Sequence, residues 1–238
     1  MIEFRDVSYR AGGKQILDRL SLCVEQGETL VLLGRSGSGK TTALKMVNGL
    51  LRPSSGEVWV GGRPTTEWDP VRLKRSIGYV IQETGLFPHF TVERNIGLVP
   101  RLEGWDEVRI AARVRELLDM LDLRAELAAR YPRDLSGGQR QRVGVARALA
   151  ADPAVLLFDE PFGALDPVTR AEVQRQFAAL SQRLRKTSLF VTHDVREALS
   201  LASRIALLRG GTLELLAAPQ EFRRAKHEEA QAFLACLD

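Results

Sequence analysis

Apolar and polar positions follow two patterns along this chain, and the first pattern indicates a β-sheet. Four short runs are apolar almost throughout and are bounded by polar or glycine-rich turns, as in strands buried on both faces of a parallel sheet. Other apolar pieces adjoin glycine turns, which favours antiparallel pairing. The predicted buried strands are 29–33, 77–82, 154–159 and 187–192, and the other strand-like pieces are 2–7, 21–24 (after a turn at 11–14), 57–62, 205–208 and 213–216.

In the second pattern, apolar residues recur at helical spacing, and this pattern dominates the middle of the chain. Residues 43–48 carry it directly after a glycine-rich stretch, and residues 106–151 carry it without a clear strand. Residues 84–105 predict a loop-rich connector that exposes aromatic groups, and the tail from Pro219 predicts a helix. We interpret 83–153 as a helical subdomain inserted into an α/β lobe. Its expected amphipathic helices are one with Val108, Ala111, Ala112, Leu117, Leu118 and Leu121 on its apolar face, and one over 143–150.

The glycine-rich stretch 34–42 lies between a predicted strand and a predicted helix. Its spacing, G-x-x-x-x-G-K-T, is that of a phosphate-binding loop, in which glycines bring backbone N–H groups close to phosphate oxygens. The helix N-terminus adds partial positive charge. Lys40 is expected to bind the β- and γ-phosphates, and the Thr41 hydroxyl to ligate Mg²⁺. A linker that happens to contain lysine would not need this spacing. The candidate binding residues are Gly34, Ser36, Gly37, Ser38, Gly39, Lys40, Thr41 and Thr42.

Three of the predicted buried strands end in polar side chains or are directly followed by them. Asp159 is expected to hold Mg²⁺ through its water shell, and Glu160 to orient or deprotonate a water that attacks the γ-phosphate. Gln82 can contact Mg²⁺ and that water, and His193 can hydrogen-bond the γ-phosphate. Each residue alone also fits an ordinary strand end or helix cap. One shared site explains all four together.

Two further features leave alternatives open. Ser136, within Leu135-Ser136-Gly137-Gly138-Gln139, is a good N-cap, and the two glycines allow an anion to approach the backbone. The same residues also fit a simple helix start. Tyr9 can stack on adenine, although an isolated tyrosine ordinarily belongs to a core or a surface patch.

Composition narrows the class of protein. The 238 residues are 45% hydrophobic and 27% charged, and no run approaches the roughly 20 apolar residues that cross a bilayer. The N-terminus has no signal-peptide character, so we expect a cytosolic protein with reduced Cys23 and Cys236. The net charge is +4, but 34 basic residues are interspersed with 30 acidic ones, so charge does not indicate nucleic-acid binding.

Taken in order, Gly34–Thr42, Gln82, Leu135–Gln139, Val155–Glu160 and His193 make the chain resemble the nucleotide-binding subunit of an ABC transporter over residues 1 to about 220. The resemblance implies a P-loop NTPase (RecA-like) α/β core with an antiparallel β subdomain and an inserted helical subdomain. In this sequence the core would comprise 1–82 and 154–220, the helical subdomain 83–153, and a helical tail 221–238.

The resemblance also implies how the site works. Tyr9 would stack on adenine, and Asp166 would lie at a dimer interface. Ser136, Gly137, Gly138 and Gln139 of one subunit would cover the γ-phosphate bound by the Lys40 loop of the other. Two ATP molecules, with Mg²⁺, would then be enclosed in a homodimer that hydrolysis releases.

The implied partners are membrane proteins. The connector Gln82–Arg101 would pass the motion to two permease subunits at the cytoplasmic face of the membrane, working with an extracytoplasmic substrate-binding protein. Its Leu86, Phe87 and Phe90 fit such a groove, with a local hydrophobic cluster as the competing interpretation. The stretches 77–89 and 95–105 are similar to importers of glycine betaine, choline and related osmoprotectants. The sequence departs from that group at Arg35, where proline is common, and the C-terminal regulatory domain of many members is not expected here.

Two other classes fit less well. A non-transport ABC ATPase acting on DNA usually interrupts this fold with long coiled coils or zinc modules, and neither pattern occurs here. A kinase with the same phosphate loop would leave Leu135–Gln139 and Asp166 without a role. An importer of another small solute, such as an amino acid, is the remaining alternative.

Overall fold

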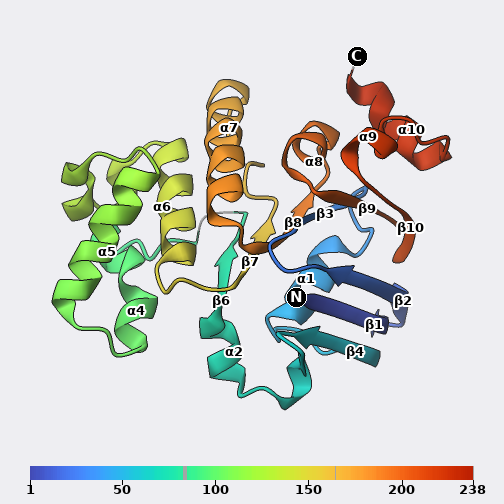
Figure 1. Ribbon diagram of the computed structural model, residues 1–238, viewed down its shortest axis with the longest axis horizontal. Coiled ribbons are helices and arrows are strands. Elements are labelled where there is room, and N and C mark those ends of the chain that lie inside the picture. The colour runs from blue at the N-terminus through green and yellow to red at the C-terminus, as the bar shows by residue number, and fades with distance from the viewer. Residues whose placement is uncertain (83–84, 164, 238) are drawn as a thin grey trace. The chain divides into compact units, whose positions relative to one another are not determined.

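The computed structural model describes residues 1–82, 85–163 and 165–237 (Figure 1). The chain divides into two compact units, one formed by Met1–Lys74 with Arg185–Asp238 and the other by Arg75–Leu184. Within the described ranges, no helix combines the length and the apolar character needed to cross a lipid bilayer. The expected subdomain boundaries at 82/83 and 153/154 stay a prediction.

An antiparallel sheet forms one half of the first unit, in the strand order β2-β1-β4-β5 (Figure 1). Gly12 and Gly13 have positive φ and close the β1–β2 hairpin, in which Ala11 pairs with Lys14. The predicted turn at 11–14 is therefore confirmed, whereas both strands are longer than their apolar cores. The strands are β1 (Ile2–Ala11), β2 (Lys14–Val24), β4 (Ser55–Val60) and β5 (Arg63–Pro64).

Parallel strands form the other half of the first unit. β3 (Thr29–Leu33) pairs in parallel with β8 (Thr187–Thr192) and β9 (Arg204–Arg209), and β10 (Thr212–Ala217) pairs antiparallel with β9. Every residue of β3 and β8 is buried, and the middle of each strand is apolar, as expected of strands covered on both faces. The helical segments are α1 (Lys40–Val47), η1 (Thr65–Glu67), α2 (Pro70–Ser76, where the chain passes to the second unit), α8 (Val195–Leu201), α9 (Pro219–Phe222), α10 (Glu228–Leu234) and η4 (Ala235–Leu237).

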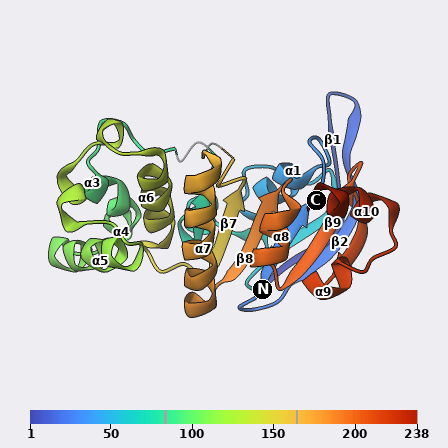
Figure 2. The ribbon, with the colours of Figure 1, turned by 90° about the horizontal axis from the view of Figure 1, so that it is seen from above.

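The second unit pairs β6 (Ile77–Val80) in parallel with β7 (Val155–Asp159). Helices α3, α4, α5 and α6 gather in one cluster (Figure 2), and α6 packs on β6 so closely that a Cβ on Gly78 would overlap the Ala148 carbonyl oxygen. The helical segments are α3 (Val92–Ile96), α4 (Leu98–Leu102), α5 (Glu107–Met120), η2 (Ala125–Ala129), η3 (Pro132–Asp134), α6 (Gly137–Leu149) and α7 (Pro167–Leu184).

The structure corrects several element predictions. β6 ends at Val80, so Gln82 lies in the turn that follows and not on the strand. Val108 is 80% exposed, and the buried face of α5 comes from Ile110, Val114 and their helical neighbours Leu117 and Leu118. Ala112 is exposed as well. The connector expected as loop contains α3 and α4, and Tyr9 lies within β1 and not after it.

Candidate functional site

The loop between β3 and α1 is arranged around Lys40. This side chain is buried, and its Nζ donates to the carbonyl oxygens of Gly34 at 2.7 Å and Arg35 at 2.9 Å. The lysine side chain therefore lies within the loop, and its ammonium group is next to the loop backbone. A buried ammonium group is suited to an anion that approaches the same loop.

Glycines make this path possible. Gly39 has φ +97°, and a Cβ there would lie 2.6 Å from Leu17 Cδ2 and 2.8 Å from the Ile16 carbonyl oxygen. A Cβ on Gly34 would lie 2.6 Å from Ser38 Oγ. Gly37 has φ +79° but open space around it, so backbone conformation alone favours glycine there. The Ser38 hydroxyl is buried with no hydrogen-bond partner among the described residues, which leaves a polar group available to a ligand.

Strand register places His193 beside this loop. β3 and β8 run in parallel with Leu33 opposite Thr192, so Gly34 and His193 leave the sheet side by side. The Thr192 hydroxyl donates to Glu197 at 2.5 Å and accepts the Asp194 N–H at 3.0 Å, which fixes the bend that exposes His193. The imidazole is thus held at the carboxyl edge of the sheet, where parallel sheets bind ligands.

Tyr9 reaches the same region through the antiparallel sheet. It pairs with Leu17 across β1 and β2, and Leu17 packs against Gly39 of the loop. Its half-buried ring is therefore close to the start of α1. This position suits a ring that covers one side of a bound base, and it equally suits a tyrosine at the sheet margin.

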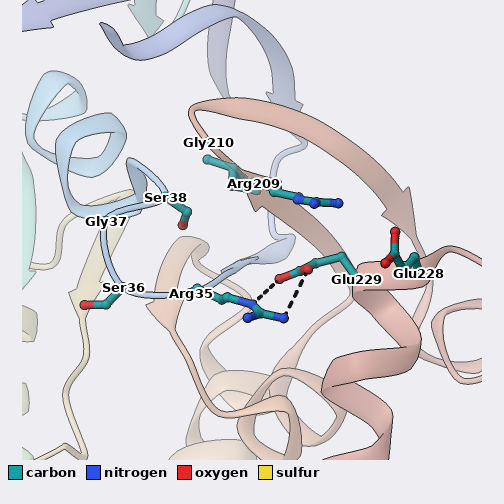
Figure 3. A pocket seen from close by; sticks show the side chains of 9 residues that line it. Arg35, Ser36, Gly37, Ser38, Arg209, Gly210, Glu228 and Glu229 are labelled. Atoms are coloured by element: carbon teal, nitrogen blue, oxygen red, sulfur yellow. Dashed lines mark hydrogen bonds and ion pairs between the residues drawn. The ribbon is translucent and has the colours of Figure 1, made fainter. Parts of the chain in front are cut away.

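A pocket of about 380 Å³ lies on the other flank of the loop (Figure 3). Arg35 points across it to α10, where its Nε donates to Glu229 Oε1 at 2.6 Å and its Nη2 to Oε2 at 3.4 Å. The Glu229 side chain is 8% exposed and that of Arg35 70% exposed. The C-terminal helix is thus attached to the phosphate loop by an ion pair, which no local sequence pattern predicts.

In the second unit, Asp159 ends β7 and Glu160 follows it. Asp159 is 9% exposed, and its Oδ2 accepts a hydrogen bond from the Tyr79 hydroxyl at 3.2 Å. Burial, reinforced by the Asp159 charge, raises the pKa of Tyr79 above its usual range, so this hydroxyl stays a donor. Glu160 has φ +45°, the left-handed region that non-glycine residues rarely adopt and that often marks functional sites.

Gln82 lies next to this strand end. A Cβ on Gly163 would lie 3.5 Å from Gln82 Nε2 and from the Glu160 carbonyl oxygen, so the amide borders the turn after β7. The Gly163 N–H donates to the same Glu160 oxygen at 3.2 Å and closes that turn. The structure therefore brings together Asp159, Glu160 and Gln82, three residues expected at one site.

Ser136 is the N-cap of α6. Its hydroxyl accepts the Gln139 N–H at 3.2 Å, and the Gln139 side chain accepts the Ser136 N–H at 2.9 Å, which completes a capping box. A Cβ on Gly138 would lie 2.7 Å from Thr169 Cγ2, so this glycine allows α6 and α7 to pack closely. Ser136 itself is exposed at the helix end, as a group that meets an outside ligand must be.

Asp166 has a local role that the sequence did not reveal. It precedes α7, and its Oδ1 accepts the Thr169 N–H at 3.1 Å. Hydrogen bonding with Thr169 lowers the pKa of this exposed carboxyl group. Asp166 thus stays charged at the start of α7.

The connector is held in shape by Asn95, which is fully buried. Its side chain accepts the Phe87 N–H at 2.8 Å and donates to the carbonyl oxygens of Phe87, Phe90 and Thr91 at 3.0–3.1 Å. The rings of Phe87 and Phe90 are 5.2 Å apart, and Phe87 is 40% exposed. Leu86 and Phe90 are half-buried, so Phe87 is the one exposed residue of the three expected in this cluster.

The donor sets fit a nucleotide with a hard cation. In the first unit, the loop offers backbone N–H groups, a lysine and hydroxyls to phosphate. In the second unit, Asp159 and Gln82 carry oxygen ligands of the kind that Mg²⁺ prefers. Among the residues that the structure describes, no group of three or more His, Cys, Asp or Glu side chains could hold a metal alone.

Comparison with known proteins identifies the family of the chain. The ABC transporter family model matches residues 17–163. OpuCA of Bacillus subtilis, a glycine betaine/carnitine/choline transport ATP-binding protein, is 50% identical over 213 residues, which are 90% of this chain and 56% of OpuCA. YehX of Escherichia coli, a glycine betaine uptake system ATP-binding protein, is 49% identical over 89% of this chain and 68% of YehX. The chain thus spans little more than half the length of OpuCA.

A solved structure shares the fold. The dimeric post-hydrolysis state of the ATP-binding cassette MJ0796, bound to ADP and Pi, has a TM-score of 0.81 and 33% identity, covering 92% of this chain and 99% of MJ0796. Because the ABC transporter model matches residues 17–163, more than half of the chain, this chain belongs to the ABC transporter family.

Proposed function

We propose that this chain is the ATP-hydrolysing subunit of an importer for glycine betaine, choline or related osmoprotectants. The observation that carries the proposal is the loop around Lys40, in which Gly34 and Gly39 leave no room for a Cβ and the lysine is held inside the loop. Support for the cargo comes from OpuCA and YehX, whose names give glycine betaine, carnitine or choline transport.

Each site residue has a separate task in the proposed reaction. Lys40, the loop amides and the start of α1 bind the phosphates, and Tyr9 stacks on adenine. Glu160 orients and deprotonates the attacking water, Gln82 positions that water, and His193 hydrogen-bonds the γ-phosphate. Thr41, Asp159 and Gln82 hold Mg²⁺, which when bound neutralises phosphate charge.

The proposed working unit is a homodimer that encloses two ATP molecules. Ser136, Gly137, Gly138 and Gln139 of one copy cover the γ-phosphate held by the Lys40 loop of its partner, with Asp166 at the interface. The dimer of MJ0796 supports this arrangement. The subdomain division proposed here follows from it: residues 1–82 and 154–220 bind nucleotide, 83–153 present Ser136, and 221–238 form the tail.

The proposed partners are two permease subunits at the cytoplasmic face of the membrane, served by an extracytoplasmic substrate-binding protein. The connector 82–101 is the docking segment, because Asn95 holds Phe87 at the surface in a fixed backbone frame. In the same unit, Arg147 of α6 donates to the Gly85 carbonyl oxygen at 2.7 Å, and burial lowers the pKa of Arg147. This bond links the connector to the helix that presents Ser136.

Replacing Lys40 by alanine tests the proposal. Loss of the charge that neutralises the phosphates should lower steady-state ATP hydrolysis by about 100-fold or more. Lys45→Ala, which removes a lysine elsewhere on α1, is the matched control and should hydrolyse ATP like the parent. Equal turnover by Lys40→Ala and the parent would contradict the assignment of the site.

The identity of the transported solute needs a separate measurement. Reconstitution with the permease and binding protein encoded nearby should show ATP-dependent uptake of radiolabelled glycine betaine or choline. Uptake of an amino acid in preference to these quaternary amines would support the alternative cargo and contradict this one.

A further inference from the structure

Tyr79 contacts the site but was not among the residues expected there. It lies on β6 opposite Leu157 of β7, and Asp159 is two residues beyond Leu157. Side chains two residues apart on a strand point to the same face. Tyr79, Leu157 and Asp159 therefore share a face, and the long tyrosine side chain reaches the strand end, where its hydroxyl donates to Asp159 Oδ2 at 3.2 Å.

Neighbouring packing limits where this ring can go. Gly78 faces α6, whose Ala148 leaves no space for a Cβ, so Tyr79 must face away from α6. Its ring is half-buried, and Asp159 is 9% exposed. A carboxylate so nearly buried depends on protein donors for its charge, and a hydroxyl is the one group of a tyrosine that can serve it.

A donor on one oxygen of a carboxylate restricts its rotation. With Oδ2 engaged by Tyr79, the Asp159 carboxylate is held in a restricted orientation at the end of β7. Partners that orient metal-binding groups in this way typically change metal affinity by 10–100-fold when removed.

We propose that Tyr79 is a positioning residue for the Mg²⁺–nucleotide complex and acts by holding the Asp159 carboxylate. The inference deepens the proposed function and rests on it, since it requires that Asp159 serves Mg²⁺. It differs from a purely structural role, in which the same bond would stabilise the strand end without affecting the metal.

The test is equilibrium binding of a fluorescent ATP analogue to the full chain, with excess Mg²⁺ and with EDTA. Tyr79→Phe removes only the hydroxyl, so binding in EDTA should match the parent within about twofold, whereas the strengthening by Mg²⁺ should fall by about tenfold. Tyr131→Phe removes a hydroxyl from an exposed tyrosine and should behave like the parent in both conditions.

A double-mutant cycle shows whether the effect passes through Asp159. In an Asp159→Asn background, Tyr79→Phe should cause no further loss of Mg²⁺-dependent binding, because the group that it positions is already altered. An undiminished additional loss would overturn the proposal.

Other results of the binding test would also contradict the proposed role of Tyr79. Unchanged Mg²⁺ dependence in Tyr79→Phe, equal weakening with and without Mg²⁺, or failure of that variant to fold would each overturn the role of Tyr79. In the first two cases the parent still binds Mg²⁺–nucleotide, so the proposed function survives. If the parent binds the analogue no better with Mg²⁺ than with EDTA, the proposed use of Asp159 fails as well.

Discussion

At the scale of single residues, the phosphate loop depends on glycines for two different reasons. Gly37 needs its conformation, since φ is +79° with open space around the position. Gly39 needs both conformation and space, since φ is +97° and Leu17 and the Ile16 carbonyl adjoin it. The two positions therefore separate backbone strain from steric overlap within one loop.

Alanine substitutions should reveal this difference. Gly37→Ala should cost about 1–2 kcal/mol in the free energy of unfolding, the usual penalty for a left-handed residue. Gly39→Ala adds overlap with Leu17 and Ile16, and should cost roughly 2–4 kcal/mol. Urea denaturation followed by circular dichroism measures both. Equal losses would mean that β2 moves away without cost.

At the scale of elements, the attachment of α10 to the phosphate loop is the least expected feature. Arg35 contributes its carbonyl oxygen to Lys40 and its guanidinium to Glu229, so one residue joins the loop to the C-terminal helix (Figure 3). Arg196 of α8 also donates to the carbonyl oxygens of Cys236 and Leu237 at 3.2 and 3.3 Å. These contacts therefore fasten the C-terminal segment within the first unit.

The two ends of the Arg35–Glu229 pair should not be equivalent. Arg35→Ala leaves a nearly buried carboxylate without its partner, which should cost about 1–3 kcal/mol in the free energy of unfolding. Glu229→Ala leaves an exposed guanidinium that water can solvate, and should cost less than about 1 kcal/mol. Chemical denaturation of both variants at low salt gives the comparison.

ATP affinity provides the control for that pair. Because backbone groups and Lys40 make the proposed phosphate contacts, Arg35→Ala should bind ATP like the parent. A larger loss of stability in Glu229→Ala than in Arg35→Ala would contradict the asymmetry. A loss of ATP affinity in Arg35→Ala would assign its side chain to the binding site.

At the scale of the whole molecule, the proposed reaction requires two copies. Ser136 is exposed at the start of α6, and its capping box already satisfies the local backbone, so its hydroxyl can still donate to a ligand brought by another copy. Hydrolysis and dimer closure should then be linked, because each nucleotide completes the interface.

Glu160→Gln should make this dimer visible. The substitution keeps shape but removes the proposed base, so ATP should stay bound and the protein should elute as a dimer on size exclusion with Mg²⁺ and ATP. Ser136→Arg in the same background should return the protein to a monomer while ATP still binds. A Glu160→Gln protein that binds ATP but stays monomeric would contradict the enclosed-nucleotide dimer.

Much of the fold was predictable because its signals are local. Strands buried on both faces read as apolar runs, and β3, β7 and β8 formed where predicted, apart from one residue at the start of β7. The buried face of a helix was harder to predict. Val108 was wrongly placed in the core because several apolar residues of α5 allow more than one face, and packing chose the face with Ile110 and Val114. The five-residue helices α3 and α4 escaped prediction because such short helices depend on tertiary contacts.

The phosphate-binding loop and most of the buried strands could be predicted from the amino-acid sequence alone, since each depends on residues adjacent in the chain. Only the tertiary structure decided that Tyr79 holds Asp159 and that Glu229 holds Arg35. Those pairs are 80 and 194 residues apart in sequence. Strand register and helix packing bring them together, and neither is encoded in any local pattern of polar and apolar positions.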